Sequence, residues 1–93
     1  MDEYKARLAD YIAVLEQSAK ETARAEDRNR YQQHMAAAAS MFSAIEKDKS
    51  VERLKELVAS EKRSFGWDYL AGSAGEAAEA AFHAFAAFVE NQS

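Results

Sequence analysis

The chain of 93 residues contains no proline, and its three glycines, Gly66, Gly72 and Gly75, all fall within ten residues of one another. Proline and glycine interrupt helices more strongly than any other residues. Because they are missing from the rest of the chain, helix ends there must be set by capping residues and by shifts in the apolar pattern. The freedom of the backbone is therefore concentrated between residues 66 and 75.

Apolar residues recur at helical spacing in two stripes before residue 47. The first stripe predicts a helix over residues 3–24 and comprises Tyr4, Leu8, Tyr11, Ile12, Leu15, Ala19 and Thr22. The second predicts a helix over residues 28–47 and comprises Tyr31, His34, Met35, Ala38, Phe42 and Ile45.

If both stripes belonged to one straight helix, with about 100° of rotation per residue, they would lie about 150° apart around its axis. We therefore expect a break in the polar run 25–29, with Asp27 or Asn29 as the next N-cap. The alternative is one long helix in a homodimer, in which each of the two stripes forms a separate interface.

A third helix is predicted over residues 51–64, with Ser50 as its N-cap. Its apolar face comprises Val51, Leu54, Leu57 and Val58. An extension to residue 70 would add Phe65 and Tyr69 to this face. Because Gly66 costs about 1 kcal/mol in a helix interior, we expect a kink or an end near Ser64.

Residues 72–76 are of the types that end one helix and begin the next. Gly72 suits the position after a helix, Ser73 suits an N-cap, and Glu76 three residues later would complete a capping box. A helix over residues 74–90 follows. It contains acidic residues but no lysine or arginine, which makes it an acidic surface.

No segment alternates with the period of two that strands require, and β-branched residues are few. The links between the predicted helices are short, so consecutive helices should pack antiparallel. The predicted fold is an all-α, up-and-down bundle of about four helices, with residues 1–93 forming a single domain.

Composition excludes several classes of chemistry. The chain has no cysteine, so it has no thiol nucleophile, disulfide or cysteine-ligated metal. Neither a metal-ligand spacing nor a nucleophile motif is present, and we predict no catalytic residue, no metal and no cofactor. The net charge is −4 with scattered lysines and arginines, which disfavours nucleic acid as a partner. No membrane segment or secretory signal is recognisable, so we expect a cytoplasmic protein that does not bind membranes.

Glu61 is the one acidic residue that falls on an otherwise apolar stripe, between Val58 and Phe65. A buried carboxylate must be paired or protonated, and such groups are frequent at functional sites. The simpler interpretation, which we favour, is that the helix leaves the core there or that Glu61 pairs with an arginine or tyrosine of another helix. His34, on the second stripe, is interpreted as a hydrogen-bonded residue at the edge of the core.

The segment that joins the last two helices is the best candidate for a binding surface. It holds the only tryptophan, and aromatic residues and arginine are enriched at binding hot spots. The alternative, which we favour for the free protein, is that Trp67, Tyr69 and Leu70 fold back to cap the bundle. The candidate partner-binding residues are Arg63, Phe65, Trp67, Asp68 and Tyr69.

The sequence thus favours a non-catalytic protein that binds another protein, of the kind represented by small inhibitors, immunity-type proteins or adaptors, with a homodimer as one form. The alternative function is a ligand-binding or enzymatic bundle in which Glu61, with His34 or a tyrosine, lines a pocket between helices. An enzyme is the less favoured of these two classes.

Overall fold

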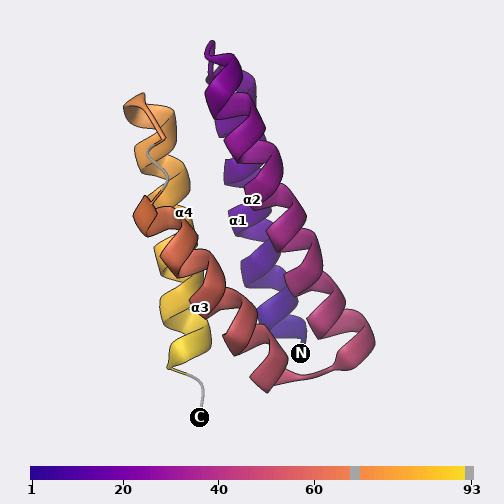
Figure 1. Cartoon of the computed structure of the whole chain (residues 1–93). Coiled ribbons are helices and arrows are strands. Elements are labelled where there is room, and N and C mark those ends of the chain that lie inside the picture. Colours follow the sequence, from indigo (N-terminus) through magenta and orange to yellow (C-terminus); the bar gives the residue numbers. More distant parts are fainter. Residues whose placement is uncertain (68–69, 92–93) are drawn as a thin grey trace.

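The computed structural model describes residues 1–67 and 70–91, which form four antiparallel helices and no strand (Figure 1). The helices are α1 (Asp2–Glu21), α2 (Ala25–Ser43), α3 (Val51–Trp67) and α4 (Gly72–Glu90), and a short π-helical turn, η1 (Ala44–Asp48), extends α2. The predicted all-α bundle is confirmed.

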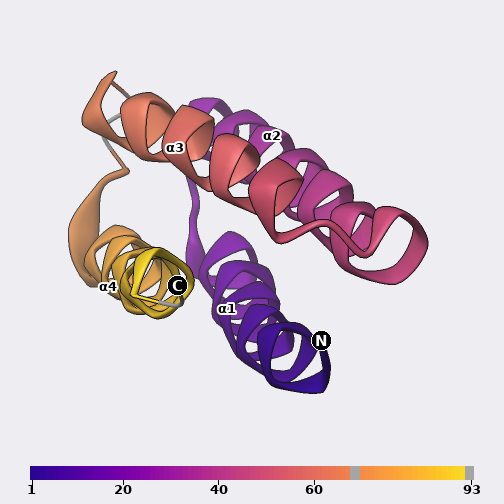
Figure 2. The same cartoon turned by 90° about the horizontal axis from the view of Figure 1, so that it is seen from below.

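Each helix packs against two neighbours. α1 contacts α2 and α4, and α3 contacts the same two helices. Viewed along the bundle, α2 and α3 form one layer and α1 and α4 form the other (Figure 2). The hydrophobic core therefore lies between two pairs of helices.

The break between the first two helices occurs earlier than the sequence indicates. Thr22 and Arg24 have extended backbones, Arg24 is the N-cap of α2, and Asp27 lies inside the first turn of that helix. The expected N-cap roles of Asp27 and Asn29 are therefore wrong. Acidic residues also stabilise the first turn of a helix through its dipole, so the polar run begins α2 instead of interrupting it.

The start of α3 is as expected, and its end agrees with the extension beyond residue 64 that the sequence left open. The backbone N–H of Arg53 donates to the Ser50 hydroxyl at 3.1 Å, which confirms the predicted cap. The helix then passes through Gly66 to Trp67 instead of ending near Ser64. Gly66 is exposed, and a Cβ added there would meet nothing within 4 Å. Nothing in the packing requires a glycine at this position.

The link from α3 to α4 depends on the other two glycines. Gly72 has a φ of 74°, a left-handed conformation that glycine adopts without strain. The expected Ser73–Glu76 capping box is not formed, because Ala71 is the N-cap of α4 and no side chain caps it. At Gly75 an added Cβ would meet the backbone carbonyl of Leu70 and lie 2.8 Å from the Leu70 Cβ. Leu70 is buried, so the link crosses tightly over the first turn of α4.

The core draws apolar residues from all four helices. Its largest fully buried apolar side chains are Tyr11, Tyr31, Phe82, Leu8, Leu15, Met41, Ile45, Leu54, Val58 and Val89. Phe42 was expected on the core face of α2 but is 39% exposed, because Met41 occupies the inward position one turn before Ile45. The ring of Phe42 instead lies beneath the Lys5 ammonium, 5.6 Å from it.

We expect Gly75 in the first turn of α4 and Gly66 near the end of α3 to respond oppositely to the same substitution. Gly75→Ala should lower the free energy of unfolding by about 1–3 kcal/mol, because its methyl group overpacks the Leu70 backbone. Gly66→Ala should raise it by about 0.5–1 kcal/mol, because alanine is the better helix former and meets no neighbour. Urea unfolding of both variants measures this. A Gly75→Ala protein as stable as the parent would contradict the close crossing.

Candidate functional site

A buried polar pair lies at the centre of the bundle. The Nδ1 atom of His34 on α2 is 3.1 Å from Oε2 of Glu61 on α3, and the two residues are 1% and 5% exposed. Glu61 is buried, so the favoured interpretation that the helix leaves the core there is wrong. Its partner is His34, which the alternative interpretation named, and not an arginine or tyrosine. His34 is hydrogen-bonded as expected, but it is buried and does not lie at the edge of the core.

Aromatic rings enclose this pair on the side of α4. The imidazole of His34 stacks on Phe65 with ring centroids 4.1 Å apart, and Phe65 stacks in turn on Phe82 at 4.6 Å. One continuous stack thus joins α2, α3 and α4. Phe65 was a candidate for partner binding, but it is 5% exposed and belongs to this stack. Phe65 is therefore not part of the surface, and its expected role in partner binding is wrong.

Tyr11 on α1 also packs in this region, so all four helices take part in it. Its ring tilts against Phe82 at 5.6 Å and lies parallel to Phe85 at 6.4 Å. Among the described residues its hydroxyl has no hydrogen-bond partner. Burial raises the pKa of Tyr11 strongly, and the negative charge of Glu61 raises it further. The phenol is therefore held in its neutral form.

Tyr31 is a second buried phenol, nearer the start of α2. Burial raises its pKa, an effect that the Ser18 hydroxyl partly offsets and that the carboxylates of Asp27 and Glu21 reinforce. Ser18 itself donates to the carbonyl of Ala74 at 2.9 Å and so fastens α1 to α4. These polar groups fix the packing near the α1–α2 turn.

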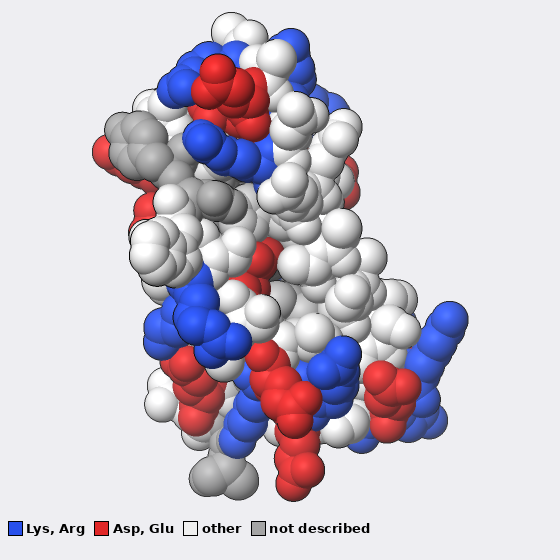
Figure 3. Space-filling view, viewed as in Figure 1, with Lys and Arg blue, Asp and Glu red and all other residues white. Residues whose placement is uncertain are grey.

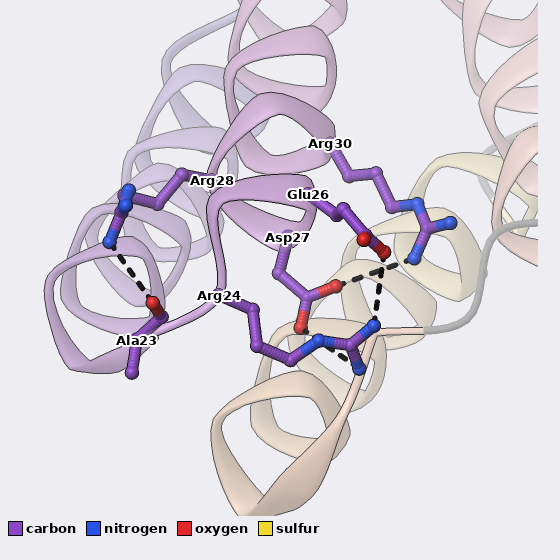
Figure 4. Close-up of polar contacts among 6 residues, drawn as sticks. All are labelled: Ala23, Arg24, Glu26, Asp27, Arg28 and Arg30. Atoms are coloured by element: carbon purple, nitrogen blue, oxygen red, sulfur yellow. Dashed lines mark hydrogen bonds and ion pairs between the residues drawn. The ribbon is translucent and has the colours of Figure 1, made fainter.

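Asp27 is a buried carboxylate that the sequence analysis did not identify as such. It lies between Arg24, the N-cap of α2, and Arg30 of the same helix, 3.9 Å from Arg24 Nη1 and 3.3 Å from Arg30 Nη1 (Figure 4). Arg24 also pairs with the exposed Glu26. The sequence did contain an indication of this cluster, because Arg24 and Arg30 each lie three residues from Asp27 and residues three apart share a helix face. The cluster holds the start of α2 in place.

The joint after α3 divides into an exposed part and a buried part. Trp67 is 88% exposed, and Arg63, one turn earlier, is exposed as well. Leu70 is buried and does fold back onto the core. The folding back that we favoured is thus correct for Leu70 and wrong for Trp67. Asp68 and Tyr69, also candidates for partner binding, lie outside the described residues.

The cavities on the surface of the described residues include the following three. One of about 400 Å³ lies between the start of α1 and η1, and one of about 280 Å³ lies between the α1–α2 turn and the start of α4. The third, of about 160 Å³, lies between α1 and α4. The residues that line the third cavity are Arg7, Asp10, Tyr11, Val14, Ala81, Ala84 and Phe85. Neither His34 nor Glu61 lines any of these three.

Charged side chains on the face shown in Figure 3 gather toward the two ends of the bundle, and a largely uncharged band crosses its middle. Within residues 1–67 and 70–91 no three histidine, aspartate or glutamate side chains form a group that could hold a metal ion. In the same part of the chain no helix is long and apolar enough to span a membrane.

The contribution of the buried pair can be measured by replacing Glu61. We expect Glu61→Leu to lower the free energy of unfolding by about 1–3 kcal/mol, because it removes the acceptor from Nδ1 of His34. Glu61→Gln should cost less, since an amide oxygen can replace the carboxylate oxygen as acceptor. His34→Leu combined with Glu61→Leu should recover part of the loss in urea unfolding. Additive losses in the double variant would contradict coupling of the two side chains.

The raised pKa of Tyr11 predicts a loss of stability at alkaline pH. The unfolded phenol ionises near pH 10, whereas the folded one resists ionisation, so the stabilisation is complete below pH 10 and declines as the pH rises above it. Tyr11→Phe should make urea unfolding less sensitive to a change from pH 8 to pH 11. Tyr4→Phe, at the partly exposed start of the same helix, is the matched control. Equal sensitivity of the parent and the Tyr11→Phe protein would refute this.

Comparison with known proteins gives no relative for this chain. No protein-family model matches it, and neither the curated proteins nor the solved structures contain a match. The geometry of the chain itself is therefore the basis for any functional argument.

Proposed function

We propose that this chain is a non-catalytic protein-binding module whose contact surface is centred on Trp67. The observation that carries the proposal is that the indole of Trp67 is 88% exposed, whereas most other large apolar side chains of the described residues are buried or partly buried. The next most exposed of the described large apolar side chains are Met1 at 40% and Phe42 at 39%. Among the described residues, Trp67 is thus the one large aromatic side chain that is almost entirely exposed to solvent.

Exposing an indole forgoes a large hydrophobic gain. A buried aromatic side chain removes about 150–250 Å² from water, worth about 4–6 kcal/mol as an upper value. A partner that covers Trp67 would gain part of this free energy. Tryptophan and arginine are the residues most enriched at binding hot spots, and Arg63 lies one turn from Trp67 on the same side of α3. The proposed contact surface therefore comprises Trp67 and Arg63.

The class of partner follows from the charge of the chain and the chemistry of this surface. Another protein, as in inhibitor, immunity-type or adaptor complexes, offers apolar area for the indole and carboxylates for the guanidinium. Nucleic acid is disfavoured because the net charge of −4 repels phosphate. The proposal includes a cytoplasmic location.

The buried pair favours a second candidate function, ligand binding or acid–base catalysis through Glu61. In its support, His34 lies 3.1 Å from Glu61, and the Tyr11 phenol is near enough for the charge of Glu61 to act on it. Against it, a general acid or base must reach its substrate, and the three cavities described above have other linings. Contacts with a partner protein at Trp67 need no such opening.

The proposal is tested first by intrinsic fluorescence, because Trp67 is the only tryptophan. In dilute solution its emission should be red-shifted and strongly quenched by acrylamide, as for an indole in water. Capture from the native cell should then retain a protein on the parent chain that Trp67→Ala loses.

Phe42→Ala is the matched control for the capture, since Phe42 is a partly exposed ring on α2. It should retain the same protein as the parent. A blue-shifted emission protected from acrylamide would contradict the exposed surface. Identical captured proteins for the parent and Trp67→Ala would contradict its role in binding.

A further inference from the structure

The cavity of about 160 Å³ between α1 and α4 is a second surface feature that neither the fold nor the proposed function uses. We infer that it receives the Trp67 indole of a second copy of this chain, so that the protein self-associates through Trp67. This inference rests on the proposed function and specifies the partner.

The size and the walls of the cavity suit one aromatic ring system. An apolar cavity of roughly 150 Å³ is large enough for benzene. The accessible part of the lining is apolar at Val14, Ala81 and Ala84 and charged at Arg7 and Asp10. The rings of Tyr11 and Phe85 also line the cavity but are only 1% and 2% exposed. An indole would therefore gain mainly from covering Val14, Ala81 and Ala84.

The charges around the indole and the cavity are complementary. Asp10 lines the cavity, is exposed, and makes no ion pair within the described residues. Arg63 is exposed one turn before Trp67 and likewise makes none within that part of the chain. Arg7, the cation beside the cavity, is already held by Glu3 at 3.3 Å and lies 4.6 Å from the Phe88 ring. With Trp67 in the cavity, Arg63 is placed to pair with Asp10 of the other copy.

The two halves of this contact lie on different parts of the bundle. Trp67 is on α3, in the layer with α2, whereas the cavity opens between α1 and α4 in the other layer (Figure 2). One contact therefore leaves an unused cavity on one copy and an unused indole on the other. Such a heterologous contact either closes into a ring or adds further copies as the concentration rises.

The test is a light-scattering measurement of molar mass from micromolar to millimolar protein. The mass of the parent chain should rise with concentration. Trp67→Ala and Ala84→Leu should each raise the concentration of half-association by about tenfold or more, by removing the ring and by filling the cavity. Ala87→Leu is the matched control, because Ala87 is also exposed on α4 but does not line the cavity.

Charge reversal tests the register of the contact. Asp10→Arg and Arg63→Asp should each weaken association, and the two changes together should restore it. Free indole is a probe of the cavity alone. Added to the Trp67→Ala protein, it should shift the methyl resonances of Ala81 and Ala84, and it should shift Ala81 much less when Ala84→Leu is also present.

The outcomes separate this inference from the proposed function. A monomeric mass at every concentration overturns self-association. If Trp67→Ala still loses a captured protein in that case, the binding role of Trp67 stands and its partner is a different protein. Association that depends on Trp67 but not on Ala84→Leu overturns the cavity as the docking site, as does the absence of indole-induced shifts.

Discussion

The structure depends on one stack of rings that ends in a buried polar pair. His34, Phe65 and Phe82 lie face against face, so α2, α3 and α4 are fixed to one another through side chains that cannot be exchanged without loss of contact. Glu61 completes the stack by meeting His34. A carboxylate inside a core is costly unless it is paired. The pair therefore disfavours any alignment of α3 that moves Glu61 away from His34, and an apolar residue at this position would impose no such restriction.

The exposure of Trp67 follows from the position of Phe65 in that stack. Two residues that are two positions apart on a helix point about 200° away from each other. With Phe65 directed into the core, and with α3 extending through Gly66 to Trp67, the indole must face solvent. The return of the chain is completed by Leu70, which is buried against the first turn of α4 where Gly75 leaves room for it. The exposed ring and the tight link are consequences of the same packing.

The two surface features with a proposed role belong to different helices and differ in charge. The end of α3 offers an indole with a guanidinium, and the α1–α4 face offers a cavity lined in part by a carboxylate. Tyr11 and Phe85 line this cavity and belong to the core, but Trp67, Arg63, Asp10 and Ala84 are exposed and do not. A surface of this kind can be altered without loss of the fold, so binding and stability can be measured separately.

The sequence by itself determined the elements of this protein and the inward faces of its helices. The spacing of apolar residues predicted four helices, and the residue type of Ser50 predicted a cap, because each depends on a few neighbouring residues. The same spacing put Glu61 on an apolar stripe, but the favoured interpretation let the helix leave the core there, whereas Glu61 is buried. Only the tertiary structure decided what each inward residue meets. His34 and Glu61 are 27 residues apart, and Leu70 meets Gly75 only because the link folds over α4. The pattern also placed Phe42 inside and Asp27 at a cap, whereas the structure exposes Phe42 and buries Asp27. Periodicity gives the direction of a side chain relative to its own helix axis, but the rotation of that helix against its neighbours is set by packing among all four.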